Sequence, residues 1–174
     1  HKAEDLYKQI LDADPDHAVV LHLLGVINFQ VGKNEIAVDL ISKSVAIKPD
    51  YAEAHNNLGN TLKALKKLDE AADSYHKALT LNPDILEAHN NLGNTLKDLG
   101  RLDEAVACYH KALAIEPDFA EAHNNLGNAL KILGKLDEAA DSYHKALAIK
   151  PEIVEAHNNL GNVLKELGKL DEAV

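Results

Sequence analysis

Histidine is the side chain here with the widest chemical repertoire, and seven of the ten histidines recur in the sequence at a period of 34. A zinc site needs ligands that converge on one ion at about 2.0–2.1 Å. One histidine per repeat, on helices that pack roughly 8–10 Å apart, does not converge in this way. We therefore predict no metal site and no other cofactor. Our interpretation is that four of these histidines are half-buried packing residues: His55, His89, His123 and His157.

No other residue is arranged for catalysis. Cys108 is the only cysteine and stands where the flanking repeats have Ser74 and Ser142, so we interpret it as a tolerated small residue. Asp69 and Glu70 recur in each later repeat at a predicted helix start, where carboxylates interact favourably with the helix dipole. The repeated Leu-Gly-Asn sequence lies inside a predicted helix and is not a phosphate-binding loop. We predict that these residues include no catalytic residue and that the chain itself is not an enzyme.

Asparagine provides the most regular set of candidate binding residues. Three asparagines and a lysine recur on one face of a predicted helix that also carries Glu53 and its copies. Asparagine is a mediocre helix former, about 0.5 kcal/mol worse than alanine, but its amide offers the donors and the acceptor that match a peptide bond. We therefore predict peptide or protein binding by Asn56, Asn57, Asn60, Lys63, Asn90, Asn91, Asn94, Lys97, Asn124, Asn125, Asn128, Lys131, Asn158, Asn159 and Asn162.

The elements that position these residues form a repeat with a period of 34, which proline marks at Pro15, Pro49, Pro83, Pro117 and Pro151. A fixed period of this length indicates a solenoid, in which each repeat packs mainly on its neighbours. Such an array presents a long continuous surface rather than an enclosed pocket. The period therefore favours a function in which a partner is held along that surface.

Each repeat is predicted to contain two helices. In residues 52–85, apolar or small side chains recur at helical spacing from Ala54 to Leu65 and again from Leu68 to Leu79. Lys66 separates the two runs, and Pro83 ends the second helix. Glycine at the position of Lys66 supplies the left-handed residue that ends a helix, and it occurs in the later repeats as Gly100, Gly134 and Gly168.

The pattern Leu58-Gly59, Ala71, Tyr75, Ala78 and Pro83, at a period of 34, resembles the tetratricopeptide repeat and covers the whole chain. The resemblance implies an all-α, right-handed superhelical solenoid of antiparallel helix pairs. We divide the chain into a half repeat with only a second helix (1–17), repeats 18–51, 52–85, 86–119 and 120–153, and a truncated repeat (154–174). Repeat 18–51 departs from the pattern at Leu21 and Ile41, where the other repeats have histidine and tyrosine.

In this family the first helices of successive repeats line a concave groove. The asparagine rows resemble the asparagine ladder in the repeat domain of O-linked N-acetylglucosamine transferases, with matching positions at Asn57, Asn91, Asn125 and Asn159. One hypothesis is a non-catalytic scaffold that binds an extended peptide or protein in the groove. The alternative is the substrate-recruiting region of a larger transferase, chiefly an O-linked glycosyltransferase, as in bacterial proteins that join such repeats to a transferase. A solvated polar face without a ligand is a third interpretation of the asparagines.

Composition argues against several partner classes. The formal net charge of −10 and the pI of about 5.4 oppose binding to nucleic-acid phosphates and to anionic membranes. The groove-face glutamates would likewise repel the acidic tails that some family members bind through lysine and arginine. No apolar run approaches the ~18 residues of a membrane span, and no signal peptide is visible. We therefore expect a cytoplasmic location, although the sequence begins at His1 without the native N-terminus.

Repeat 18–51 and the two ends break the regular pattern. The groove face of this repeat indicates a hydrophobic docking patch or a surface covered by further sequence; it comprises Val19, His22, Leu23, Val26, Phe29 and Gln30. Solenoids need polar capping helices, and neither end shows one. We therefore expect end-to-end self-association through unpartnered apolar faces, at Leu6, Tyr7 and Ile10 at one end and Leu160, Leu164, Leu167 and Leu170 at the other.

Overall fold

The structure is a computed structural model that describes residues 2–169. The chain forms two compact units, residues 1–88 and residues 89–174. Within the described residues there are ten α-helices and no strand. The first unit contains α1 (Lys2–Ala13), α2 (Ala18–Gln30), α3 (Asn34–Ile47), α4 (Ala52–Ala64), α5 (Leu68–Leu81) and the start of α6 (Leu86–Asp98). The second unit contains the rest of α6, α7 (Leu102–Ile115), α8 (Ala120–Ile132), α9 (Leu136–Ile149) and α10 (Val154–Glu166).

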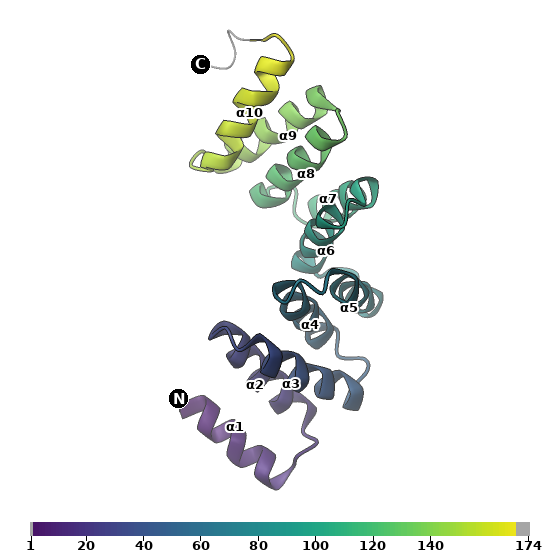
Figure 1. Ribbon diagram of the computed structural model, residues 1–174, viewed down its shortest axis with the longest axis vertical. Coiled ribbons are helices and arrows are strands. Elements are labelled where there is room, and N and C mark those ends of the chain that lie inside the picture. Colours follow the sequence, from purple (N-terminus) through teal and green to yellow (C-terminus); the bar gives the residue numbers. More distant parts are fainter. Residues whose placement is uncertain (1, 170–174) are drawn as a thin grey trace. The chain divides into compact units, whose positions relative to one another are not determined.

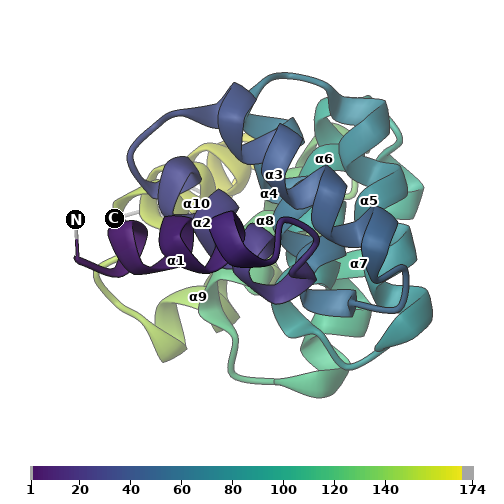
Figure 2. The same ribbon diagram turned by 90° about the horizontal axis from the view of Figure 1, so that it is seen from below.

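Antiparallel helix pairs are the building blocks of both units. In the first unit, α2 packs on α3 and α4 packs on α5, while α3 lies against α4 and α1 against α2 (Figures 1 and 2). In the second unit, α8 packs on α9, with α7 against α8 and α10 against α9. The first helices α2, α4, α6, α8 and α10 begin at the same regular interval as the sequence repeat. The predicted all-α array of helix pairs is confirmed.

The turns within the helix pairs use a left-handed residue, as predicted from the glycines. Gly32, Gly100, Gly134 and Gly168 have φ between 74° and 78°. Lys66 occupies the same position in its repeat with φ of 62°, and it is the one non-glycine residue with positive φ among those described. A side chain here is strained because Cβ approaches the following carbonyl oxygen.

A close approach between a glycine and one large side chain holds each pair together. A Cβ built on Gly59 would lie 2.6 Å from Cε1 of Tyr75, and one on Gly127 would lie 2.7 Å from Cε1 of Tyr143. Both tyrosines are fully buried. The two helices of a pair therefore approach closely at the glycine, and the side chain that fills the space over it is the tyrosine of the second helix.

The prediction of unpartnered apolar faces is partly wrong. Leu160 and Leu164 are only 8% and 2% exposed, because α10 packs on α9 and α8. Leu167, Tyr7 and Ile10 are half-buried, and Leu6 is 54% exposed. The prediction for Leu170 falls outside the described residues. None of the described helices combines the length and the apolarity that a membrane crossing would require.

Candidate functional site

The periodic histidines of the first helices connect three of these helices, α4, α8 and α10, to the preceding turn. Nε2 lies 3.0 Å from the carbonyl oxygen of Pro49 in His55, 2.9 Å from that of Pro117 in His123, and 2.8 Å from that of Pro151 in His157. A ring nitrogen that faces a carbonyl oxygen must carry the proton and donate it. These histidines therefore have a structural role. Within residues 2–169, no three His, Cys, Asp or Glu side chains are placed to hold a metal ion.

Cys108 is buried on α7. Burial raises the pKa of its thiol, which disfavours the thiolate that a nucleophile or a metal ligand requires. This agrees with its interpretation as a small packing residue.

Three tyrosine–asparagine pairs connect the core to the predicted binding face. The hydroxyl of Tyr75 donates to Oδ1 of Asn60 at 2.7 Å, and the same bond measures 2.8 Å in the pairs Tyr109–Asn94 and Tyr143–Asn128. Burial raises the pKa of all three phenols, so they remain protonated donors at neutral pH. Because an amide has one acceptor atom, this bond fixes which way each asparagine points.

The ladder asparagines donate to the preceding first helix. Nδ2 of Asn125 donates to Oδ1 of Asn90 at 3.0 Å, whereas Nδ2 of Asn159 donates to Oδ1 of Asn128 at 2.9 Å. Nδ2 of Asn57 lies 2.8 Å from Nε2 of His22. In these three repeats the amide nitrogen is thus turned toward a neighbouring helix, which leaves the carbonyl oxygen as the atom that can accept a bond from a ligand.

Three of the asparagines that precede them in sequence are buried, and their part in binding stays a prediction. Asn56, Asn90 and Asn124 are only 9%, 3% and 5% exposed. Asn90 is paired through Asn125 and through Glu121, whose Oε1 accepts from Asn90 Nδ2 at 3.2 Å. In Asn56 and Asn124, by contrast, Oδ1 is buried without a hydrogen-bond partner.

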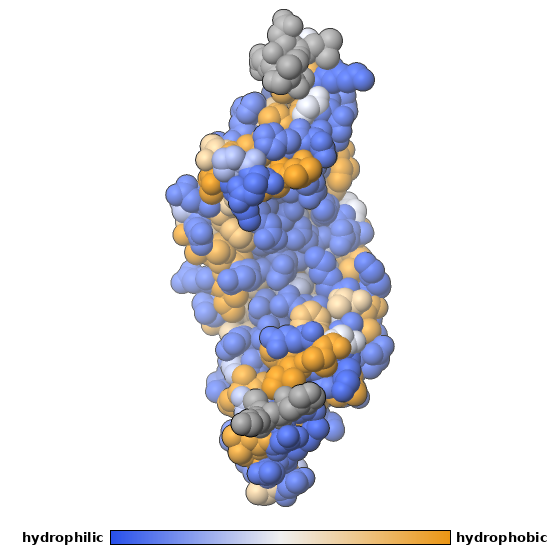
Figure 3. Space-filling model, turned by 90° about the vertical axis from the view of Figure 1, so that its left-hand side faces the viewer, coloured by the Kyte–Doolittle hydropathy of each residue, from blue (hydrophilic) through white to orange (hydrophobic). Residues whose placement is uncertain are grey.

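The remaining predicted residues lie further toward solvent. Lys63, Lys97 and Lys131 are half-buried, while Asn158 and Asn162 on α10 are exposed. Half-burial of a lysine covers its aliphatic stem and leaves the ammonium group in water. In a space-filling view of one face of the protein, hydrophilic side chains predominate and the apolar ones form separate patches (Figure 3).

In α2 a buried histidine replaces the buried asparagine of the other repeats. His22 is 1% exposed. Since the amide nitrogen of Asn57 can only donate, Nε2 of His22 accepts, and Nδ1 carries the proton that faces the Tyr51 hydroxyl at 3.0 Å. Burial lowers the pKa of His22, which keeps the ring neutral. His22 was predicted on the groove face, but this role could not be predicted from the sequence because its partner Tyr51 lies in a turn.

In the first unit, a cavity of about 500 Å³ is lined by Asn57 and Tyr51, the two residues that contact His22. Its lining combines Asn56, Asn57 and the two carboxylates of Glu53 and Glu87 with turn residues that the sequence did not single out. The full lining is Tyr51, Ala52, Glu53, Asn56, Asn57, Asn82, Ile85 and Glu87. The cavity therefore lies on the predicted binding face rather than on the opposite surface.

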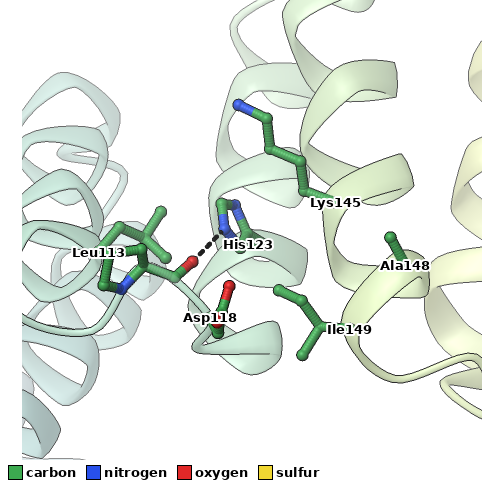
Figure 4. Close-up of a pocket in the computed structure, with 7 residues that line it drawn as sticks. Leu113, Asp118, His123, Lys145, Ala148 and Ile149 are labelled. Carbon is green, nitrogen blue, oxygen red and sulfur yellow. Dashed lines mark hydrogen bonds between the residues drawn. The ribbon is translucent and has the colours of Figure 1, made fainter.

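A second kind of cavity recurs between a turn and the next helix pair. In the second unit it measures about 420 Å³, and His123 lies between the turn at Asp118 and the stem of Lys145 (Figure 4). The first unit has the same crevice, of about 360 Å³, with Leu21 in place of the histidine. This crevice is a consequence of repeat packing and does not depend on the histidine.

These observations define the class of protein: an all-α array of helix pairs with a polar face along its first helices. Two family models described as tetratricopeptide repeat match residues 52–85 and 74–107, and one described as TPR repeat matches residues 93–134 and 127–168. Together these matches span 52–168. The chain belongs to the tetratricopeptide repeat family.

Solved structures agree with this assignment. A crystal structure of MamA is 30% identical, with 86% of this chain and 87% of that chain covered and a TM-score of 0.81. YrrB, described as a TPR protein with an unusual peptide-binding site, has a TM-score of 0.83 at 21% identity, over 97% and 87% of the two chains. The first TPR of Spaghetti (RPAP3), bound to the HSP90 peptide SRMEEVD, has a TM-score of 0.66 at 27% identity, over 67% and 93%. Among curated proteins, none matches.

Proposed function

We propose that this protein is a non-catalytic interaction scaffold that binds an extended peptide, or an extended segment of a partner protein, along the first helices of its repeats. The observation that carries the proposal is the repeated tyrosine–asparagine bond of 2.7–2.8 Å. It holds an amide of the binding face in one orientation before any ligand arrives. An amide that is already oriented loses less conformational entropy on binding, and this favours affinity.

The face then carries both amide N–H groups and amide oxygens, the two kinds of group that a peptide backbone can pair with. The amide nitrogen of Asn128 points toward Glu155, to whose Oε1 it donates at 3.0 Å, while the carbonyl oxygens of Asn125 and Asn159 can accept. An extended peptide advances about 3.3 Å per residue. Neighbouring helices at roughly 8–10 Å would therefore contact its backbone about once every third residue. Such contacts read the backbone and tolerate many side chains.

Two structural neighbours are described with peptides: the RPAP3 repeat domain is bound to an HSP90 peptide, and YrrB has a peptide-binding site. We propose peptide binding for this chain as well, but not of acidic tails, because Glu53, Glu87, Glu121 and Glu155 lie exposed on the corresponding helices. No observation favours the transferase alternative. The cytoplasmic location remains a prediction, as does self-association through the end helices, where Leu6 is 54% exposed.

The proposal is tested by selection from a random extended-peptide library on the immobilised protein, followed by affinity measurements on the selected peptides. The variant in which alanine replaces Asn57, Asn91, Asn125 and Asn159 should bind these peptides with an affinity at least ~10-fold lower, since each contact with these four asparagines is lost. Alanine is the better helix former, but each lost side-chain bond costs about 0.5–1.5 kcal/mol. We therefore expect a modest fall in the melting temperature with full helicity retained.

A matched control replaces His76, His110 and His144, which are exposed on the second helices and equally periodic. This variant should bind the selected peptides as the wild type does. Equal affinity of the asparagine variant and the wild type would contradict the proposal and favour a solvated polar face.

A further inference from the structure

The cavity of about 500 Å³ in the first unit is lined by acidic side chains and by no basic ones among the described residues. Two carboxylates, Glu53 and Glu87, line it together with three asparagines, and none of the described residues in its lining is lysine, arginine or histidine. A volume of this size falls within the roughly 300–1,000 Å³ typical of sites that bind small groups. The carboxylates give the cavity a negative potential that an anionic or neutral occupant would not offset.

Of the three asparagines in the lining, Asn56 and Asn57 have a side-chain oxygen that can accept, whereas Oδ1 of Asn82 already accepts from the backbone N–H of Asp84 at 3.1 Å. Asn57 has its Nδ2 turned to His22, so its Oδ1 is the atom that can receive a donor. Asn56 also lines the cavity, is only 9% exposed, and its Oδ1 has no hydrogen-bond partner. A buried acceptor without a donor is unfavourable, so a ligand that brings N–H groups is favoured here.

The other walls suit an aliphatic stem. Ile85, Ala52 and the ring of Tyr51 provide apolar surface beside the polar atoms. Lys48 lies over the Tyr51 ring, with Nζ 5.1 Å from the ring centroid, and it is not part of the lining. Among the natural side chains, lysine and arginine combine an aliphatic stem with a cationic head that carries only donors.

We propose that this cavity binds the cationic side chain of a lysine or arginine in the peptide that occupies the groove. This inference rests on the proposed function and adds to it a preference for basic peptides. Arginine should be the better occupant, because its planar fork can donate to a carboxylate and to an amide oxygen at the same time. Glu53 and Glu87 supply the charge, and Asn56 and Asn57 accept the remaining N–H groups.

The equivalent positions of the second unit, two repeats further along the sequence, lack this character. Lys150 stands where the first unit has Asn82, and Phe119 stands where it has Tyr51. Glu155, which corresponds to Glu87, already accepts a bond from Asn128. The basic preference is therefore assigned to the first unit alone.

Fluorescence anisotropy with four peptides tests the inference on the whole chain. One short, uncharged, extended host peptide carries at its centre arginine, lysine, glutamate or citrulline, which is the uncharged analogue of arginine. We expect the arginine peptide to bind about 10-fold tighter than the citrulline peptide, with lysine between them. In the double variant Glu53→Gln/Glu87→Gln the arginine and citrulline peptides should bind equally.

A control variant, Glu35→Gln/Glu70→Gln, removes the same charge from exposed positions on α3 and α5 of the same unit. It should retain the preference for arginine, and circular dichroism should show equal helicity in both variants. The side-chain amide signals of Asn56 and Asn57 should shift in NMR spectra on addition of the arginine peptide and not on addition of the glutamate peptide.

Three results would overturn the inference. Equal affinity of the arginine and citrulline peptides for the wild type would show that the groove binds peptides without reading charge, so the proposed function would stand without this addition. Competition by free N-acetyl-arginine amide at the concentration of the arginine peptide would show a small-molecule cation site instead. Failure of all four peptides to bind would count against the inference and the proposed function together.

Discussion

The helix pairs α2–α3 and α4–α5 share one backbone arrangement but differ in what fills the space between their helices. A Cβ built on Gly25 would lie 2.5 Å from Cγ1 of Ile41, and one built on Gly59 would lie 2.6 Å from Cε1 of Tyr75. Both large side chains are fully buried. The packing of the pair therefore requires one large side chain over the glycine, and isoleucine meets that requirement as well as tyrosine does.

The hydroxyl that distinguishes the two pairs is connected to the binding face. Where Tyr75 donates to Asn60, the pair α2–α3 has Ile41 and Val26 at the equivalent positions. Tyrosine and asparagine are thus present together in one pair and absent together in the other. Since the pair α2–α3 packs without this hydroxyl, the effect of the tyrosine–asparagine bond is to orient the Asn60 amide on α4.

The close approach at the glycine, which both pairs share, should produce the largest effect when it is broken. Gly127→Ala places a methyl group against the ring of Tyr143, which is buried on all sides, so overpacking should cost about 1–3 kcal/mol. Urea unfolding of the two proteins measures the difference.

Gly161 on α10 is the matched control, because no neighbouring atom of residues 2–169 lies within 4 Å of a Cβ at that position. There, alanine should be neutral or should stabilise by up to about 1 kcal/mol through helix propensity. A Gly127→Ala variant as stable as the wild type would show that the ring moves aside and that the close approach is not required.

The hydroxyl should contribute less to stability than the close approach does. Tyr143→Phe keeps the ring and removes the bond to Asn128, at a cost of about 0.5–1.5 kcal/mol. Combined with Asn128→Ala in a double-mutant cycle, the two changes should be non-additive by a similar amount, because both remove the same bond. Strict additivity would show that Tyr143 and Asn128 are not energetically coupled. The difference between the helix pairs with and without the hydroxyl would then not explain how the asparagine is oriented.

A substitution in the turn between α4 and α5 should raise the stability of the protein, whereas the preceding substitutions should lower it. Lys66 has φ of 62°, a conformation that costs a non-glycine residue roughly 1–2 kcal/mol. Glycine removes that strain but loses more entropy on folding, by roughly 0.5–1 kcal/mol. Lys66→Gly should therefore stabilise the protein by about 0.5–1 kcal/mol in the same unfolding measurement. A loss of stability would show that the lysine side chain makes a contact worth more than the strain.

Much of the fold follows from the sequence because the regular period fixes the helices, and the glycines and prolines fix their ends. Local patterns did not reveal which polar residues are buried. Asn56 and Asn57 are adjacent in sequence, yet Asn56 is buried and Asn57 half-buried, since packing between repeats decides it. The bond between Tyr75 and Asn60 joins two different helices, so no local spacing signals it. Leu164 was expected at an unpartnered face for the same reason, although α10 buries it on α9.

The smallest expected effect concerns His22, which distinguishes α2 from the other first helices, where asparagine stands at this position. Burial lowers the pKa of His22 below its ordinary value of 6.5. Between that value and the lowered one, the unfolded chain binds a proton that the folded protein excludes. The contribution of His22 to stability is therefore complete above about pH 6.5. It falls as the pH falls through this window and changes no further below the folded pKa.

Urea unfolding over a pH series isolates this contribution when the wild type is compared with His22→Asn, because all other histidines remain in both proteins. The difference in stability between the two should shift in favour of the variant as the pH falls below 6.5. A constant difference across the series would mean that His22 accepts the proton while folded, which the amide nitrogen of Asn57 opposes as long as it faces Nε2.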